Sequence, residues 1–292
     1  MLRQLFMNGI ITGSIYALVA ASFALIYQTT RFFHFAHGGI YTAGAYFAYM
    51  LSVPFGLPKA AAVAIAVIAG AGMGVFCDYA VYRPLRKRRA SAMALLLASL
   101  GVLVVLQNTI SMFFGDDLKT MRSRHVAEGI SILGANITMV QLGILGATSV
   151  AFFALWLVLY RTSLGLQVRA VANDAELARI AGTSPDKTIT WVFAIGSALA
   201  AGAAILISFD TDLTPNMGFQ ALLMGMIAAI VGGIGSLWGT VLGAFFLGLV
   251  RQLAVWKLPG QWQDAIVFLV LITFLLFRPN GFLGGGRRPR SF

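Results

Sequence analysis

Apolar runs long enough to cross a lipid bilayer recur along the whole chain, and short polar segments separate them. A bilayer core about 30 Å thick needs roughly 20 apolar residues in a helix. The segments that meet or approach this length are 5–27, 59–82, 90–113, 137–160, 189–209, 219–235, 236–252 and 263–278. A shorter segment, 39–54, fits either a full span or a re-entrant half-helix. Because lipid cannot satisfy backbone polar groups, the sequence predicts an all-α, polytopic membrane helix bundle of eight or nine membrane segments.

The composition is that of an integral membrane protein. Of the 292 residues, 59% are hydrophobic and only 11% are charged, which favours one transmembrane domain over 1–292. The net charge of +11 would suggest nucleic acid in a soluble chain, but most cations lie in short loops and face lipid headgroups. We therefore expect no nucleic acid partner. A single cysteine, Cys77, excludes an intrachain disulfide and a multi-cysteine metal site.

Loop charges predict the orientation of the bundle. Cationic residues crowd segments 83–89 and 278–290, whereas segment 210–218 carries only acidic charges, Asp210 and Asp212. By the positive-inside rule the first two are cytoplasmic and the third is external. The N-terminus is external if the shorter segment spans the membrane and cytoplasmic if that segment is re-entrant.

A polar interruption at 161–188 has too many charges to lie in lipid, and we place it on the cytoplasmic side. Within it, 168–181 predicts a short amphipathic helix, and Gly182 is a common left-handed helix stop. Such a unit could dock into a groove on another protein and convert the motion of that partner into helix tilt. The alternative is a solvated connector. The residues expected to couple the chain to an ATPase are Arg169, Glu176, Ala178 and Gly182, the last three of which keep the spacing of the EAA-x3-G loop of ATP-driven importers.

Glycines recur every four residues near the C-terminal end of the chain. Gly235, Gly239 and Gly243 would share one helix face and let another backbone approach closely, so we predict helix packing there. Just before them, Gly232 and Gly233 form a tight turn and are predicted as pathway or hinge residues. An internal repeat, with 44–47 (GAYF) resembling 243–246 (GAFF), is a further hypothesis.

Several polar residues fall within or beside apolar spans, where they are costly enough to be functional candidates. We interpret His37 with Gly38 as a pathway or packing hinge. Gln107 and Asn108 could hydrogen-bond between helices or face a substrate path. Two imidazoles three residues apart, without nearby Cys, Asp or Glu, fall short of a metal site, so none is expected.

Asp78 is the one acidic residue near the interior of an apolar span. We expect a charge that either snorkels to the membrane surface or pairs with an arginine, rather than a proton relay. This scarcity of acids weighs against a gradient-driven secondary transporter or channel for a small polar solute, which is the main alternative. No Gly-Lys dipeptide, and hence no Walker A loop, occurs in the sequence, nor does an HExxH or GxSxG motif. A purely structural role as a membrane scaffold is the third hypothesis.

The chain resembles the LivH-type permease subunits of branched-chain amino acid ABC importers over nearly its whole length. The similarity lies in motifs that occur in the order of the family, at 35–38 with 44–46, 82–86, 106–108 with 114–115, 161–165, 169–172, 182, 193–202 and 232–239. Two departures concern regions expected to line the pathway. His34 stands where the family usually has Asn, and 95–101 lacks the usual Ile-Ala-Thr character.

The resemblance implies a permease subunit of the bacterial cell inner membrane that forms a translocation path for branched-chain or related amino acids. It also implies an assembly with a second permease subunit, two cytoplasmic ATPase subunits and a periplasmic substrate-binding protein. The chain itself would be no enzyme and would hold no cofactor, since ATP would be bound by the partner subunits. The exact substrate is left open.

Overall fold

The computed structural model describes residues 1–283 apart from 123–128 and 133. Seven helical stretches of the described chain are long and apolar enough to cross a membrane. They contain α1 (Leu2–Thr30), α3 (Lys59–Cys77), α5 (Ala92–Phe114), α6 (Met139–Arg161), α9 (Pro185–Ser208), α11 (Leu237–Ala254) and α12 (Gln263–Phe277). The shorter helices α2 (Ala36–Ser52) and α10 (Met217–Gly232) complete the bundle. The predicted all-α membrane bundle is confirmed, and its eight or nine segments agree with this set.

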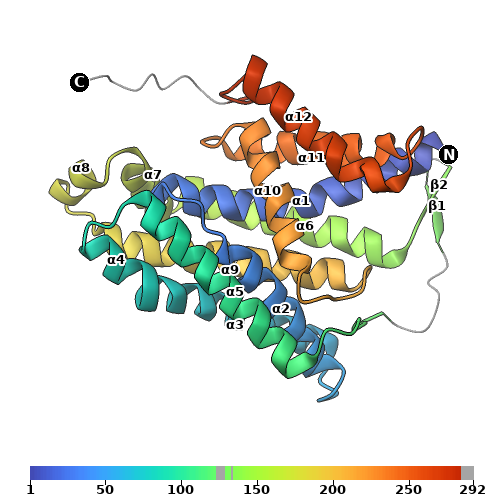
Figure 1. Ribbon diagram of the computed structural model, residues 1–292, viewed down its shortest axis with the longest axis horizontal. Helices are drawn as coiled ribbons and strands as arrows, with labels where there is room; N and C mark the ends of the chain where they lie inside the picture. Colours follow the sequence, from blue (N-terminus) through green and yellow to red (C-terminus); the bar gives the residue numbers. More distant parts are fainter. Residues whose placement is uncertain (123–128, 133, 284–292) are drawn as a thin grey trace.

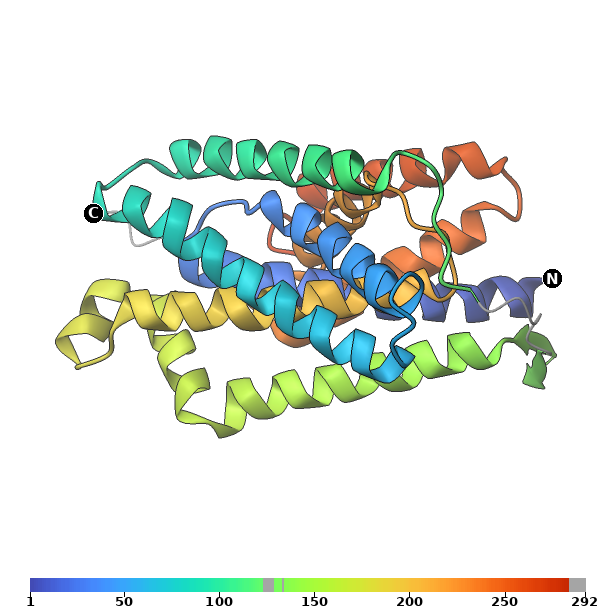
Figure 2. The ribbon, with the colours of Figure 1, turned by 90° about the horizontal axis from the view of Figure 1, so that it is seen from below.

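Most long helices run along the longest axis of the molecule, whereas α10 crosses them (Figure 1). The central helix is α1, since 89% of its apolar window is buried, against 6% for the stretch that contains α12. Gly9 and Gly13 let α11 approach α1 closely: a Cβ on Gly13 would lie 2.9 Å from Phe245 Cα. The outer helices α5 and α6 lie on different sides of this centre (Figure 2). Their exposed apolar faces therefore suit lipid or a partner subunit.

Contacts between chain ends and loops show that α2 runs across the bundle. At one end, Arg31 Nη2 donates to Ala172 O at 2.7 Å, which places the end of α1 beside the 161–188 segment. At the other end, the Lys59 ammonium lies 5.7 Å from the ring centroid of Phe209, next to the acidic 210–218 segment. This course favours the full-span alternative for 39–54, which together with the positive-inside assignment predicts an external N-terminus.

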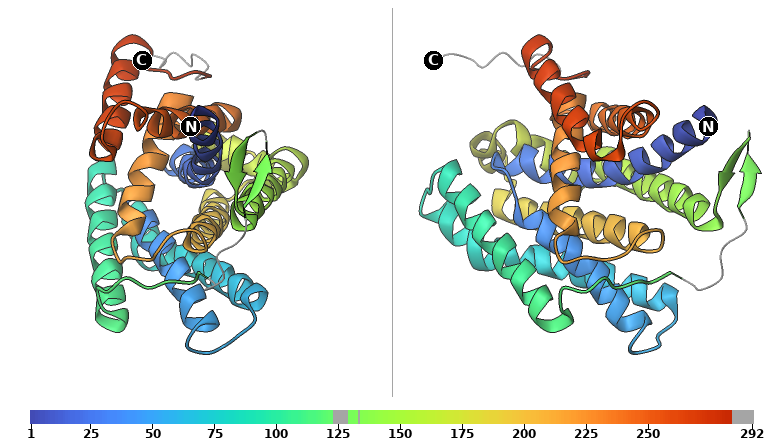
Figure 3. Two further views of the ribbon diagram at one scale, coloured as in Figure 1. Left: turned by 90° about the vertical axis from the view of Figure 1, so that its right-hand side faces the viewer. Right: turned by 45° about the vertical axis from the view of Figure 1, so that its right-hand side comes forward.

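Two short antiparallel strands, β1 (Ile130–Ile132) and β2 (Ala135–Ile137), lie beside the N-terminus at the end of the bundle predicted to be external (Figure 3). Gln4 extends this pairing, because its side chain donates to Asn136 O at 2.9 Å and accepts from Asn136 N at 2.8 Å. The sequence predicted no strand in this segment. A hairpin this short has no apolar periodicity by which it could be found.

The helix predicted over 168–181 is wrong as a single unit. The structure has two helices instead, α7 (Ser163–Asn173) and α8 (Ala175–Ile180), which are separated at Asp174. The Asp174 carboxylate accepts hydrogen bonds from Glu176 N at 2.9 Å and Leu177 N at 3.0 Å. An Asp that caps the next helix in this way competes with the continuation of the previous one.

The two segments of the hypothesised repeat have different neighbours. A Cβ on Gly44 would lie 2.5 Å from Ala201 Cβ on α9, whereas one on Gly243 would lie 2.4 Å from Ala228 O on α10. In both places glycine allows a close helix crossing. The repeat itself stays a prediction.

Candidate functional site

The end of the bundle that carries α7 and α8 also carries α4 (Arg83–Lys87), the helix in the cationic segment 83–89 (Figures 1 and 2). The remaining cationic residues of the C-terminal segment, Arg287, Arg288 and Arg290, lie outside the described residues. The acidic segment 210–218 lies at the opposite end, where Lys119 and Leu213 form a backbone bridge. This separation of charge agrees with the predicted orientation.

Helix α8 ends as the sequence predicts, at a left-handed glycine. Gly182 has φ +85°, and Thr183 N donates to Ala178 O at 2.9 Å while Gly182 N donates to Arg179 O at 3.1 Å. These two bonds make a Schellman motif, which satisfies the last carbonyls of the helix. A Cβ at Gly182 would meet no atom within 4 Å, so the backbone conformation and not crowding requires glycine there.

The exposed face of α8 is apolar at its tip. Ile180 is 83% exposed and Leu177 is 61% exposed, while Glu176 is exposed beside them and Ala178 packs into the core. Large apolar side chains that protrude from a polar hairpin mark a docking surface. The coupling residues predicted from the sequence did not include Leu177 and Ile180, because an apolar stripe does not by itself show which of its side chains stay exposed after packing.

Arg169 is directed away from this surface. Its guanidinium donates to Leu159 O and lies 5.4 Å from the ring centroid of Tyr160, both in the last turns of α6. The structure therefore separates Arg169 from Glu176, Ala178 and Gly182, with which it was grouped. Its contacts hold α7 against the end of α6.

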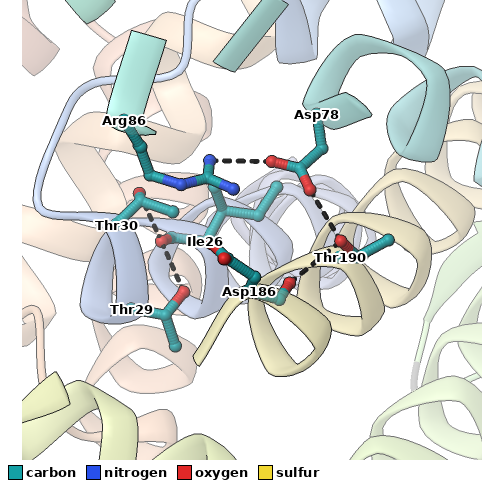
Figure 4. Close-up of polar contacts among 7 residues, drawn as sticks. All are labelled: Ile26, Thr29, Thr30, Asp78, Arg86, Asp186 and Thr190. Carbon is teal, nitrogen blue, oxygen red and sulfur yellow. Dashed lines mark hydrogen bonds and ion pairs between the residues drawn. The ribbon is translucent and has the colours of Figure 1, made fainter. Parts of the chain in front are cut away.

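A buried ion pair between Asp78 and Arg86 ties α4 and the turn before it to the start of α9 (Figure 4). The chain continues from α3 through a π-helical turn, Asp78–Tyr82, into α4. Asp78 Oδ1 lies 2.7 Å from Arg86 Nη1, and Thr190 Oγ1 donates to Asp78 Oδ2 at 2.7 Å. The Asp78 side chain has no exposed surface. The predicted arginine pairing is confirmed, and the cluster joins two helices that a long stretch of sequence separates.

His34 and His37 are fully buried where the chain enters α2. His37 Nε2 lies 2.8 Å from Ser22 Oγ on α1. His34 sits in an aromatic cluster, with ring centroids 5.2 Å from Tyr82, 5.1 Å from Phe193 and 5.7 Å from His37. The break before α2 is thus packed against α1, the π-helical turn and α9.

Gly38 marks a close crossing with α10. A Cβ on Gly38 would lie 2.7 Å from Gly218 O, and one on Gly218 would lie 1.9 Å from Gly38 O. Thr42 Oγ1 bridges the crossing, since it donates to Gly38 O and accepts from Gly218 N, each at 3.1 Å. The packing role predicted at Gly38 fits this geometry, but Gly218 and Thr42 were missed.

A second crossing joins the ends of α10 and α11. A Cβ on Gly239 would lie 2.3 Å from Gly232 O, and Gly233 takes φ +103° in the turn. Phe282 N and Leu283 N donate to Val231 O at 2.9 Å and Gly232 O at 3.1 Å, so the C-terminal segment satisfies the end of α10.

Gly239 and Gly243 pack as predicted, against α10 of the same chain. The prediction for Gly235 is wrong. It lies in the turn before Ser236, the N-cap of α11, and a Cβ there would meet no atom within 4 Å. The four-residue spacing was read as one helix face, but the helix begins after the first glycine.

Gln107 and Asn108 lie on the outer helix α5. The exposed Asn108 amide donates to Val104 O of its own helix at 2.8 Å. Within the described part of the chain, no hydrogen bond from either side chain to another helix is found. Contact of these residues with a substrate path stays a prediction.

Broken helices, glycine-lined crossings and polar residues at membrane depth are the architecture of a membrane transport protein. The chain belongs to the family described as "Branched-chain amino acid transport system / permease component", whose model matches residues 5–275. It is therefore a transport permease subunit and a multi-pass protein of the inner membrane.

Curated relatives cover nearly the whole chain. It is 33% identical to the high-affinity branched-chain amino acid transport system permease protein BraD of Pseudomonas aeruginosa, over 97% of this chain and 95% of that protein. It is 32% identical to the corresponding permease protein LivH of Escherichia coli K12, with the same coverage. Among solved structures, PsaBC from Streptococcus pneumoniae in complex with Fab matches with a TM-score of 0.52 at 12% identity, covering 94% of this chain and 91% of that chain. The structural likeness shows the fold alone.

Proposed function

We propose that this permease forms the translocation path for branched-chain or related amino acids in an ATP-driven importer. Relatives named as branched-chain amino acid permeases, similar over 97% of the chain, support this substrate class. The proposed assembly contains a second permease subunit, two cytoplasmic ATPase subunits and a periplasmic substrate-binding protein. In this proposal ATP is bound by the partner subunits, because the sequence of this chain lacks the Gly-Lys pair of a phosphate loop.

The observation that carries the coupling role is the exposed apolar tip of α8. Ile180 and Leu177 protrude from a hairpin that begins at α6 and ends at α9. An ATPase subunit that holds this tip would move α9 through the short connection 181–184. Asp78 and Arg86 would carry the displacement to α3 and α4, because Thr190 of α9 bonds to Asp78. Binding of ATP would thus be converted into a change of helix tilt.

Reconstitution of the complete importer in vesicles tests the proposal. We expect uptake of leucine, isoleucine or valine that requires the binding protein outside and ATP at the ATPase subunits. A matched control is the same complex with the phosphate-loop lysine of its ATPase subunits replaced by alanine, which should abolish uptake. Uptake by this chain alone, driven by a proton or sodium gradient without ATP, would contradict the proposal and favour a secondary transporter.

A further inference from the structure

The end of the bundle opposite α8 holds a cavity of about 440 Å³. Its walls come from α1, α2, α6, α10, α11, α12 and the segment after α9. Its polar residues include Tyr16, Tyr41, Asp210, Gln220, Arg251 and Asp264. By the orientation above, this cavity opens to the external side, where a binding protein would release its solute. Its volume lies within the range usual for small-molecule sites.

One guanidinium in the cavity is held in place by its neighbours. Arg251 Nη1 donates to the Tyr16 hydroxyl, and the guanidinium lies 5.9 Å from the centroid of that ring. Asp264 Oδ1 lies 3.1 Å from Arg251 Nη2. The Arg251 side chain nevertheless remains 28% exposed. A fixed guanidinium with free surface is suited to bind a carboxylate, because its N–H groups match the two oxygens.

The acidic residues of the cavity are not all neutralised. Asp264 is paired with Arg251, and Asp212 lies 3.9 Å from Arg122. Asp210, which is half-buried, has no ion-pair partner within the part of the chain that the structure describes. Among the described residues, Asp210 is thus a cavity carboxylate without a paired cation, and such a group attracts an ammonium group.

The inner wall of the cavity is apolar. Ile15 and Met224 are only 4% and 5% exposed, and Ala221 and Met217 line the cavity beside them. An uncompensated carboxylate, a fixed guanidinium and an aliphatic wall together fit a small zwitterion with an aliphatic side chain. A simple amine would leave Arg251 unused, and a simple carboxylate would face the charge of Asp210.

We propose that this cavity is a binding site for the α-amino acid itself on the external side of the permease. Asp210 would bind the ammonium group and Arg251 the carboxylate, while Tyr16 and Asp264 position the guanidinium. This inference rests on the proposed function and adds that the permease recognises the amino acid after the binding protein has released it.

Protection of a cysteine placed in the cavity tests the site without relying on transport. Cys77, the single native cysteine, is 3% exposed, so a membrane-impermeant maleimide should leave the wild-type importer unlabelled. The exposed Gln220 on α10 is replaced by Cys in the complete importer, with Thr211→Cys as a second position. Asp117→Cys, exposed at the same end but outside the cavity, is the matched control.

We expect leucine to slow labelling of Gln220→Cys and Thr211→Cys but not of Asp117→Cys. 4-Methylpentanoate, which lacks the ammonium, and 3-methylbutylamine, which lacks the carboxylate, should not protect. Adding Asp210→Asn should raise the half-protecting leucine concentration by about tenfold, because a hydrogen bond to a charged group is lost.

Equal protection by all three compounds would contradict the proposed binding site. So would a lack of protection by leucine in an importer that takes up leucine with ATP. ATP-driven uptake of leucine in the same vesicles separates the two claims. If the importer transports leucine but leucine does not slow labelling of the cavity cysteines, the proposed function stands and the cavity assignment is wrong. If the importer neither transports nor binds any aliphatic amino acid, both the proposed function and the cavity assignment are wrong.

Discussion

The two ends of the helix bundle carry the same kind of ion pair in different surroundings. Near α8, Asp78 and Arg86 are buried, with side-chain exposures of 0% and 16%. At the opposite end, Asp264 and Arg251 are 47% and 28% exposed and line a cavity. A buried pair must persist because removal of either ion leaves the other buried without compensation, whereas a partly exposed pair leaves guanidinium surface free to bind a solute. The first arrangement suits transmission of force and the second suits ligand binding.

The largest expected contrast between the two ends of the bundle is the side of the membrane that each faces. In intact cells, a cysteine at Asp212 should react with an impermeant thiol reagent, whereas one at the exposed Lys87 should react only after permeabilisation. Both follow from the cationic and acidic ends described above. The unsubstituted chain, whose Cys77 is buried, is the control. Labelling of Lys87→Cys alone in intact cells would reverse the assignment of the two ends.

Breaking the buried pair should cost the most stability. Arg86→Met leaves the Asp78 carboxylate buried without its cation, which typically costs about 3–5 kcal/mol. Asp264→Asn at the opposite end should cost no more than about 1 kcal/mol, because that pair is partly exposed. Thermal unfolding of the two purified variants measures the difference. Equal losses would show that the two pairs do not differ as their burial indicates.

The glycine crossing beside the α8 end gives a matched pair of substitutions. Gly239→Leu would place a side chain against Gly232 O, and overpacking typically costs about 1–3 kcal/mol. Gly235→Leu, where a Cβ has open space, should be close to neutral. Membrane abundance and thermal stability test the pair. Wild-type behaviour of Gly239→Leu would show that α10 and α11 are not packed at this position.

The predicted stop of α8 should matter more for transport than for stability. Gly182→Arg forces a side chain into φ +85°, at a cost of about 1–2 kcal/mol, without a clash. We expect normal membrane insertion with loss of uptake and of substrate-stimulated ATPase activity. Glu176→Ala, which removes one exposed charge, should have a smaller effect. Gly182→Asn is the control, because Asn tolerates this conformation better than Arg does.

Local signals in the sequence were enough to predict the glycine stop at Gly182 but neither the break at Asp174 that begins α8 nor the contacts that surround this helix. The Gly182 stop depends on backbone preferences within a few residues, and so it was found. Asp78 could be expected to pair with an arginine because a buried charge must be compensated. Its bond to Thr190 could not be predicted, since the two residues are 112 positions apart and only the fold joins them.

The same limit applies to the cavity end. Arg251, near the end of α11, was not singled out from the sequence, and Asp210, just after α9, was noted only for the charge of its loop. Only the packing of α1, α10 and α11 brings them to one cavity. The error at Gly235 has the opposite cause, because a periodic pattern was extended past the start of a helix that Ser236 caps.

The most direct test of the central claim is capture of the ATPase subunits by the purified permease with Ile180 replaced by Asp. Ile180 is 83% exposed at the tip of α8, and Leu166, 63% exposed on α7, provides the matched control. Loss of a central apolar contact at an interface typically costs more than about 1 kcal/mol, so we expect capture to weaken by about tenfold for Ile180→Asp. Leu166→Asp should bind as the wild type does. Undiminished capture and ATPase coupling in Ile180→Asp would contradict the assignment of α8 as the docking surface.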